Sequence, residues 1–155
     1  PYDKSVRPNQ VWVLSLPFKI LTKEKAVSVF NVIERELYNK YGLRSLSPND
    51  PRFKPRYEGK LFDRDMAYNM GTTWGFLIGD YLDAYRYIHG DSEEVTNKIN
   101  DLVHVFREHL NEGCLNGIAE IFDGDVAGRT RGCYNQAWSV GELLRAYFEN
   151  VLMEK

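Results

Sequence analysis

The sequence is poor in cysteine and has no long apolar run. Its only cysteines, Cys114 and Cys133, are too few for a disulfide framework and lack the C-x-x-C pairing of metal sites. We therefore expect two free thiols in a reducing compartment. No apolar run approaches the ~20 residues of a membrane-spanning helix, so no membrane contact is expected. The polar start of the chain also lacks the apolar core of a signal peptide.

An excess of charge of either sign is also missing. Lys and Arg number 20 and Asp and Glu number 22, which leaves a net charge of −2. Nucleic-acid binding needs a basic surface, so nucleic acid is excluded as a partner. The three histidines, His89, His104 and His109, lie in or beside helices that we expect on the outside. We expect no metal and no cofactor, since nucleophile-elbow and phosphate-loop motifs are absent too.

The size and composition are those of one globular domain. The chain has 155 residues, 43% of them hydrophobic, and no low-complexity segment interrupts it, so we treat residues 1–155 as a single domain. Aromatic residues make up 14% of the chain, which indicates either a heavy core or a stacking surface. The sequence begins at Pro1 and not at Met, and we expect it to be a piece of a longer protein.

Two segments show the apolar spacing of amphipathic helices. Residues 23–41 carry one apolar face, with Thr22 as the capping residue. A second such segment runs from Asp91 to Gly113, where Asp91 and Glu94 have the spacing of a capping box. Charged side chains occupy the opposite face of both segments, so both helices are expected on the outside of the fold.

Three other segments, residues 10–16, 66–88 and 136–152, are apolar around most of their circumference. Helices of this kind are buried, although the first segment also fits a short strand. Buried and surface segments therefore alternate along the chain. Two concentric layers of helices, in which each inner helix is followed by an outer one, produce this order. The sequence thus predicts an all-α fold.

Two long loops, residues 42–65 and 111–135, each precede a buried helix, so we expect both to open on the same end of the fold. The second loop contains Glu120 within an apolar run. A carboxylate in such a frame is either buried with a partner or directed into a cleft, and the spacing leaves both open. Asp123 and Asp125 follow in an acidic turn, where we expect them to bond local backbone N–H groups rather than calcium.

Polar and aromatic residues gather at the starts of the buried helices, in the clusters Arg7–Gln10, Tyr68–Trp74 and Tyr134–Ser139. Helix capping explains the first cluster equally well. Aromatic faces beside amide, hydroxyl and guanidinium groups also suit a sugar, because its ring stacks and its hydroxyls need donors and acceptors.

Six motifs occur in order along nearly the whole chain. They are R-P-N-Q at 7–10, L-S-P at 46–48, R-Y-E-G at 56–59, G-T-x-W at 71–74, A-E-I-F-D-G-D at 119–125 and R-G-C-x-x-Q-A-W-S at 131–139. Together they resemble the C-terminal, amylo-α-1,6-glucosidase domain of glycogen debranching enzymes. The resemblance implies a partial (α/α)6 barrel, a six-hairpin toroid, of which this chain is roughly the C-terminal half with alternating inner and outer helices.

The resemblance also implies a cytoplasmic glycoside hydrolase that removes α-1,6-linked glucose from glycogen and other branched α-glucans with inversion. Glu120, in the E-I-F-D-G motif, is implied to be the general base. The general acid lies upstream in the family, so this chain alone is expected to be inactive. The implied sugar contacts are Arg56, Tyr57, Trp74, Gln136 and Trp138, with Arg7, Asn9 and Gln10 at the rim or behind the contacts.

The chain departs from the family pattern at two expected pocket positions. Asn69-Met70 stands where many members have His-Gln or His-Asn, and Gly75-Phe76 stands where many have Pro-Trp. Two alternative functions stay open: a non-catalytic helical carbohydrate-binding or scaffold module, and an α-1,4-acting relative of glucoamylase. The inner helices of a half-barrel are also expected to expose apolar surface that binds the missing half or a second copy.

Overall fold

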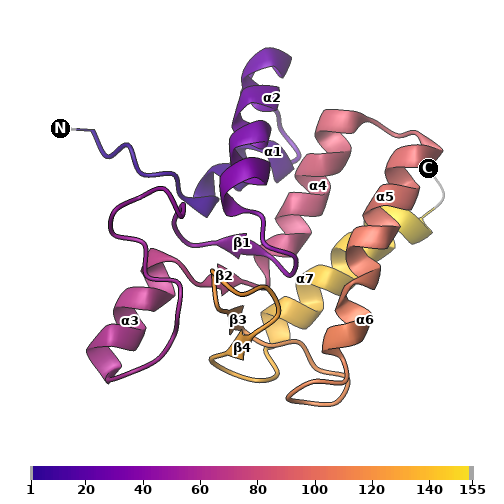
Figure 1. Cartoon of the computed structure of the whole chain (residues 1–155). Helices are drawn as coiled ribbons and strands as arrows, with labels where there is room; N and C mark the ends of the chain where they lie inside the picture. The colour runs from indigo at the N-terminus through magenta and orange to yellow at the C-terminus, as the bar shows by residue number, and fades with distance from the viewer. Residues whose placement is uncertain (1, 154–155) are drawn as a thin grey trace.

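The computed structural model describes residues 2–153 and shows a helical protein with a small sheet (Figure 1). The central helix is α4 (Leu77–His89), which packs against both α1 (Trp12–Ser15) and α7 (Ala137–Tyr147). Helices α2 (Lys23–Val32) and α5 (Glu93–His104) also pack against α4. The partial (α/α)6 barrel with alternating inner and outer helices, which the resemblance implies, stays a prediction.

Helix α2 begins where the sequence predicts but ends earlier. The Thr22 hydroxyl accepts a hydrogen bond from the backbone N–H of Lys25 at 3.5 Å. The helix continues as a π-helical turn, Ile33–Leu37, and stops at Tyr38, whose backbone is extended. The predicted helix to residue 41 is wrong because Tyr38 instead forms an antiparallel bridge with Leu43.

Helix α5 is capped by Ser92, whose hydroxyl accepts from a backbone N–H three residues on at 3.3 Å. The predicted cap at Asp91 is wrong by one residue, because Ser92 directly precedes the first helical residue and reaches the unpaired N–H groups there. The helix ends at His104. A separate short helix, α6 (Phe106–His109), follows, so the helical path stops before Gly113.

Four two-residue strands form one antiparallel sheet in the order β1-β2-β3-β4. They are β1 (Leu43–Arg44), β2 (Thr73–Trp74), β3 (Ile121–Phe122) and β4 (Thr130–Arg131). Thr73 lies opposite Arg44 on one side and opposite Phe122 on the other. The sheet links loops 42–65 and 111–135 through β2, and the loops also contact each other directly where the Gly124 N–H donates to the Pro55 carbonyl at 2.8 Å. The all-α prediction is correct only in part, since the fold contains this small sheet. Strands of two residues are too short to show the alternation of apolar and polar residues that marks a strand in a sequence.

The predicted buried segment 66–88 is interrupted. Helix α3 (Leu61–Met70) ends at Gly71, and strand β2 follows before α4 begins. A Cβ at Gly71 would lie 2.7 Å from the backbone carbonyl of Lys54, so the close approach of the first long loop requires glycine. The interruption brings the end of α3 close to Trp74 of β2, whose indole N–H donates to the Tyr68 carbonyl.

Helix α7 and the turn after it, Phe148–Leu152, are buried on one side only. Leu143 and Ala146 are buried, whereas Leu144 and Phe148 are more than half exposed. The predicted burial on all sides is therefore wrong, because α4 and α5 cover only one face of this helix. No helix within residues 2–153 is both long and apolar enough to span a bilayer.

Candidate active site around Glu120

The Glu120 carboxylate is half-buried and is fixed by two neutral donors. Its Oε1 accepts from the hydroxyl of Tyr68 at 2.8 Å, and its Oε2 accepts from the backbone N–H of Cys133 at 3.0 Å. Its own N–H donates to the carbonyl of Cys133 at 2.8 Å, and its carbonyl accepts from the N–H of Gly75 at 3.1 Å. Within the described chain, Glu120 forms no ion pair. The side chain is therefore oriented without a cation against it.

Gly132 makes room for this carboxylate. Its φ of +65° is left-handed, and a Cβ built on it would lie 2.6 Å from Oε2 of Glu120 and 3.0 Å from a side-chain carbon of Ile121. A side chain at this position would therefore push Glu120 out of its place. Sequence reasoning did not single out Gly132, although it lies in the R-G-C motif beside the residue that donates to Glu120.

Tyr68 connects Glu120 to an aromatic surface. Burial, and then the hydrogen bond to Glu120, raise the pKa of Tyr68 well above that of an ordinary phenol, so its hydroxyl stays a donor at physiological pH. Its ring lies 5.2 Å from Trp74 and 6.3 Å from Tyr57, measured between centroids. The Trp74 indole N–H also donates to the Tyr68 carbonyl at 2.8 Å. Two expected sugar contacts, Tyr57 and Trp74, thus flank the residue that holds Glu120.

The two aspartates after Glu120 anchor the loops to each other. Asp123 is fully buried and accepts from Arg131 at 3.0 and 3.1 Å and from the backbone N–H of Tyr57 at 3.2 Å. Asp125 pairs with Arg56 at 2.8 Å, a hydrogen bond that raises the pKa of the Arg56 guanidinium. The expectation of purely local backbone bonds is therefore wrong for both aspartates, since Asp123 binds the Arg131 side chain and the distant Tyr57 N–H, and Asp125 binds the distant Arg56 side chain. Arg56 keeps 49% of its side chain exposed.

Arg7, Asn9 and Trp74 line one shallow cavity of about 360 Å³ together with Pro8, Ser45 and Asn69. The Arg7 guanidinium donates to the backbone carbonyls of Ser45, at 3.2 Å, and of Asn69. A cation at the end of α3 is stabilised by the helix dipole, so Arg7 fixes the cavity wall. Gln10 turns its amide back to the Arg7 carbonyl at 2.7 Å, as a residue at a helix start does.

A row of stacked rings leads from Trp74 to the start of α7. Trp74 stacks on Phe76 at 6.0 Å, and Phe76 stacks on Trp138 at 4.7 Å with an interplanar angle of 27°. Gln136 is half-buried and directly precedes α7, where its backbone N–H donates to the Ile118 carbonyl at 2.8 Å. The structure therefore brings the predicted contacts at Trp74 and Trp138 onto one aromatic surface through Phe76.

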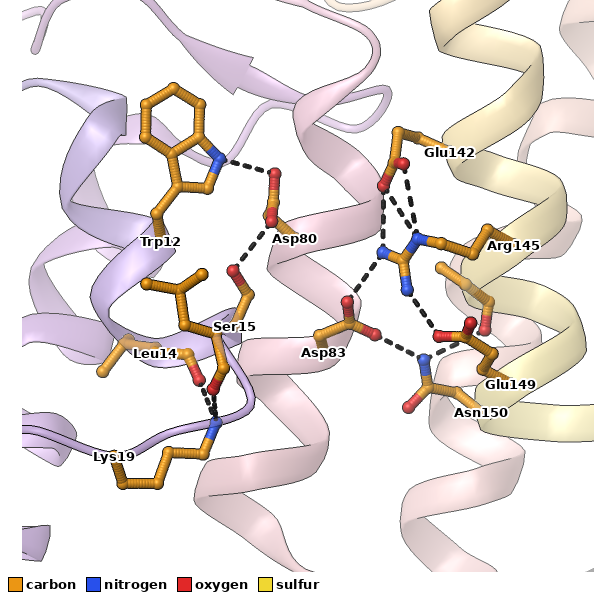
Figure 2. A network of polar contacts seen from close by, with 12 residues as sticks. Trp12, Leu14, Ser15, Lys19, Asp80, Asp83, Glu142, Arg145, Glu149 and Asn150 are labelled. Carbon is orange, nitrogen blue, oxygen red and sulfur yellow. Dashed lines mark hydrogen bonds and ion pairs between the residues drawn. The ribbon is translucent and has the colours of Figure 1, made fainter.

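A second carboxylate, Asp80 on α4, was missed by the sequence analysis (Figure 2). Its Oδ2 accepts from the Trp12 indole N–H at 2.8 Å and its Oδ1 from the Ser15 hydroxyl at 2.7 Å. Burial raises its pKa in spite of these two donors. The available signal was the same as for Glu120: Asp80 and Asp83 lie within an apolar segment, three residues apart and hence on one helix face.

Both cysteines are free thiols, with Cys133 exposed and Cys114 partly buried. In residues 2–153, no three His, Cys, Asp or Glu side chains are grouped so that they could hold a metal ion. The groups near Glu120 therefore include its own carboxylate, the Tyr68 phenol, aromatic faces and the exposed Cys133 thiol.

The family model for amylo-alpha-1,6-glucosidase matches residues 1–145. The chain therefore belongs to the amylo-α-1,6-glucosidase family, in agreement with the motif order, and the resemblance seen in the sequence is confirmed.

A curated relative is the glycogen debranching enzyme of Saccharomyces cerevisiae. It is 22% identical over 169 aligned residues, which cover 96% of this chain. The chain spans only 11% of the length of that relative.

Proposed function

We propose that this chain is part of a cytoplasmic glycoside hydrolase that removes α-1,6-linked glucose from branch points of glycogen and limit dextrins. Membership of the amylo-α-1,6-glucosidase family and the yeast debranching enzyme among its relatives support this substrate class. The reaction proceeds with inversion at the anomeric carbon, and Glu120 acts as the general base.

The geometry of Glu120 carries the proposal. An inverting hydrolase needs a carboxylate that takes a proton from the attacking water. Tyr68 and Cys133 occupy one acceptor site on each oxygen of Glu120, and an ionised carboxylate offers about four such sites. Glu120 therefore keeps acceptor sites for a water while its orientation is fixed.

The second carboxyl group of the mechanism lies outside this chain in our proposal. An inverting hydrolase separates its acid and base by about 6.5–9.5 Å, with the sugar and the water between them. This chain then supplies the base and one wall of the pocket, made by Tyr57, Trp74 and Trp138. Arg56 and Gln136 stand beside these rings as donors, and Arg7, Asn9 and Gln10 shape the rim. The chain alone is expected to bind glucan and not to hydrolyse it.

A direct test compares Glu120→Gln with the parent in the full natural polypeptide that carries this sequence. Glucose release from a limit dextrin with α-1,6-linked glucose stubs is expected to fall by several orders of magnitude, because glutamine cannot accept the proton. Glu112→Gln, the same change at an exposed glutamate eight positions earlier, serves as the control and is expected to leave release unchanged. Unchanged release by a folded Glu120→Gln protein would overturn the proposal.

One observation favours a second candidate, a non-catalytic carbohydrate-binding module. The bond from the Cys133 N–H to Glu120 is of the kind that a purely structural carboxylate makes. In that case the same Glu120→Gln variant keeps its affinity for glucan, and the parent protein releases no glucose at all.

A further inference from the structure

His109 is a buried titratable residue that the reaction proposed above does not use. It is the last residue of α6, and only 1% of it is exposed. The backbone N–H of Ala119, the residue directly before Glu120, donates a hydrogen bond to its Nε2 at 3.0 Å. A side chain of α6 is therefore bonded to the segment that carries Glu120.

This hydrogen bond assigns the proton of the imidazole. A ring nitrogen that accepts from an N–H carries no proton of its own, so the single proton of the neutral ring lies on Nδ1 of His109. Oε2 of Glu112 lies 3.4 Å from Nδ1 and accepts from it. The Glu112 side chain is 53% exposed, and the Glu112→Gln control used above keeps an acceptor there. His109 is thus a neutral histidine whose Nε2 serves one backbone N–H.

Two buried aromatic rings hold the imidazole in place. The ring centroids of Tyr41 and Phe122 lie 5.4 and 5.0 Å from that of His109, and the two rings stack on each other at 4.9 Å. Phe122 belongs to β3, which directly follows Glu120. The same imidazole therefore contacts the chain on both sides of Glu120, and the packed rings leave it little freedom to turn.

The Ala119 N–H depends on this one acceptor. Ala119 is 1% exposed, so water does not reach its N–H. On either side of it, the carbonyl of Ile118 accepts from the start of α7 at 2.8 Å, and both backbone groups of Glu120 are paired. Removal of the imidazole would leave a buried donor unpaired, and the segment before Glu120 would have to move for this donor to find another partner.

We propose that His109 is a positioning residue for the reaction: by holding the Ala119 N–H, it sets where the Glu120 carboxylate stands. The buried imidazole itself touches neither the sugar nor the attacking water. Its effect on the rate comes from geometry, since a misplacement of about 1 Å can lower a rate a hundredfold. The inference rests on the proposed role of Glu120 as the base.

The test uses two substitutions in the full natural polypeptide that carries this sequence. His109→Phe keeps a ring between Tyr41 and Phe122 and removes the acceptor. Its kcat for glucose release from limit dextrin is expected to fall about tenfold or more, with little change in KM. His109→Gln can place its amide oxygen near the position of Nε2, and it is expected to recover most of the lost rate.

The matched control is the same exchange at another histidine, His104→Phe. The ring of His104 contacts the side chain of Asn100 on its own helix, α5, at 3.2 Å. This variant is expected to keep the parental kcat and KM. Thermal unfolding of each variant gives the folded fraction in the assay. Should His109→Phe fail to fold, His109→Asn replaces it, because its shorter amide ends near the position of Nδ1 and leaves Ala119 without its acceptor.

A double variant separates positioning from a general loss of structure. In a Glu120→Gln background, His109→Phe is expected to have no further effect on the residual rate, because the base that it positions is already lost. A residue that only stabilised the fold would lower the residual rate by the same factor as it lowers the parental rate. Such an equal loss would overturn the inference.

The remaining outcomes separate this inference from the proposed function. Parental kcat in His109→Phe, or no recovery in His109→Gln, overturns the positioning role; if Glu120→Gln is inactive at the same time, the hydrolase proposal stays intact. Unchanged release by Glu120→Gln overturns the proposed function, and the positioning role is then overturned with it.

Discussion

Glu120 and Asp80 are held by the same kinds of donor in two differently built regions. Each carboxylate accepts one hydrogen bond from a hydroxyl and one from an N–H: Glu120 from Tyr68 and Cys133, and Asp80 from Ser15 and Trp12. The donors to Glu120 come from the end of a helix and from a loop. The donors to Asp80 both lie on α1, next to α4.

The difference lies in what keeps each arrangement in place. Around Asp80, packed helices fix the donors, and the side chains could be exchanged without rerouting the backbone. Around Glu120, ion pairs between loops and glycines at close approaches set the backbone itself. The loop region is therefore expected to be more sensitive to single substitutions, and the following changes are ordered by the size of the expected effect.

The largest expected effect is on stability, from Asp123→Ala in the loop region. Asp123 is fully buried, and its loss leaves the Tyr57 N–H without an acceptor and leaves Arg131 with Glu58 alone. Breaking such a buried pair costs about 3 kcal/mol of unfolding free energy, which urea unfolding followed by circular dichroism would measure. The control is Asp125→Ala, whose solvent-screened pair with the exposed Arg56 contributes little to stability. Equal losses in the two variants would refute the idea that the buried Asp123 contributes more to stability than the exposed Asp125–Arg56 pair.

The helical half of the molecule could be predicted from the sequence, and the loop half only in part. The positions of α2 and α5 follow from apolar spacing, and the Thr22 cap was located correctly. The strands could not be predicted, because two residues such as Thr73 and Trp74 have no period, and their pairing is set by contacts between distant loops.

The motifs of the candidate site could be predicted from the sequence, but the positions of its side chains relative to one another could not. Glu120 stood out in the sequence as a carboxylate within an apolar run. The hydrogen bond from Tyr68 and the close approach of Gly132 could not be predicted, because these residues lie 52 and 12 positions away from Glu120 in the chain. Asp80 carried the same signal as Glu120 within its apolar segment, and only the structure shows its contacts with Trp12 and Ser15.

A pair of glycine variants separates backbone strain from displacement of Glu120. Gly132 and Gly113 both have left-handed φ values, of +65° and +58°. Alanine at either position costs about 1–2 kcal/mol of stability for that conformation. Only at Gly132 would the new Cβ collide with Glu120, since nothing lies within 4 Å of one at Gly113. Glucose release by the full polypeptide is therefore expected to fall more than tenfold in Gly132→Ala alone, and a similar fall in Gly113→Ala would contradict this.

Tyr68→Phe tests whether the phenol acts through Glu120. The ring contacts with Trp74 and Tyr57 are kept, and only the 2.8 Å hydrogen bond is lost. The kcat for glucose release is expected to fall about tenfold, as for a hydrogen bond to a charged group, with little change in KM. In a Glu120→Gln background the same substitution should have no further effect on the residual rate. Additive losses would mean that Tyr68 supports the site in some other way, and Tyr85→Phe on α4 controls for the loss of a hydroxyl.

The smallest expected effect is a pH dependence at Asp80. Burial raises the pKa of Asp80, with a further contribution from the nearby charges of Glu142 and Asp83, so folding favours the protonated form. The contribution of Asp80 to stability is full below its unfolded pKa, of about 3.9, and is lost as the pH rises through the folded value. Asparagine does not ionise, so the unfolding free energy of Asp80→Asn relative to the parent should rise as the pH increases above about 4. Urea unfolding at several pH values measures this difference, and a difference that falls with pH would show that the donors from Trp12 and Ser15 outweigh burial.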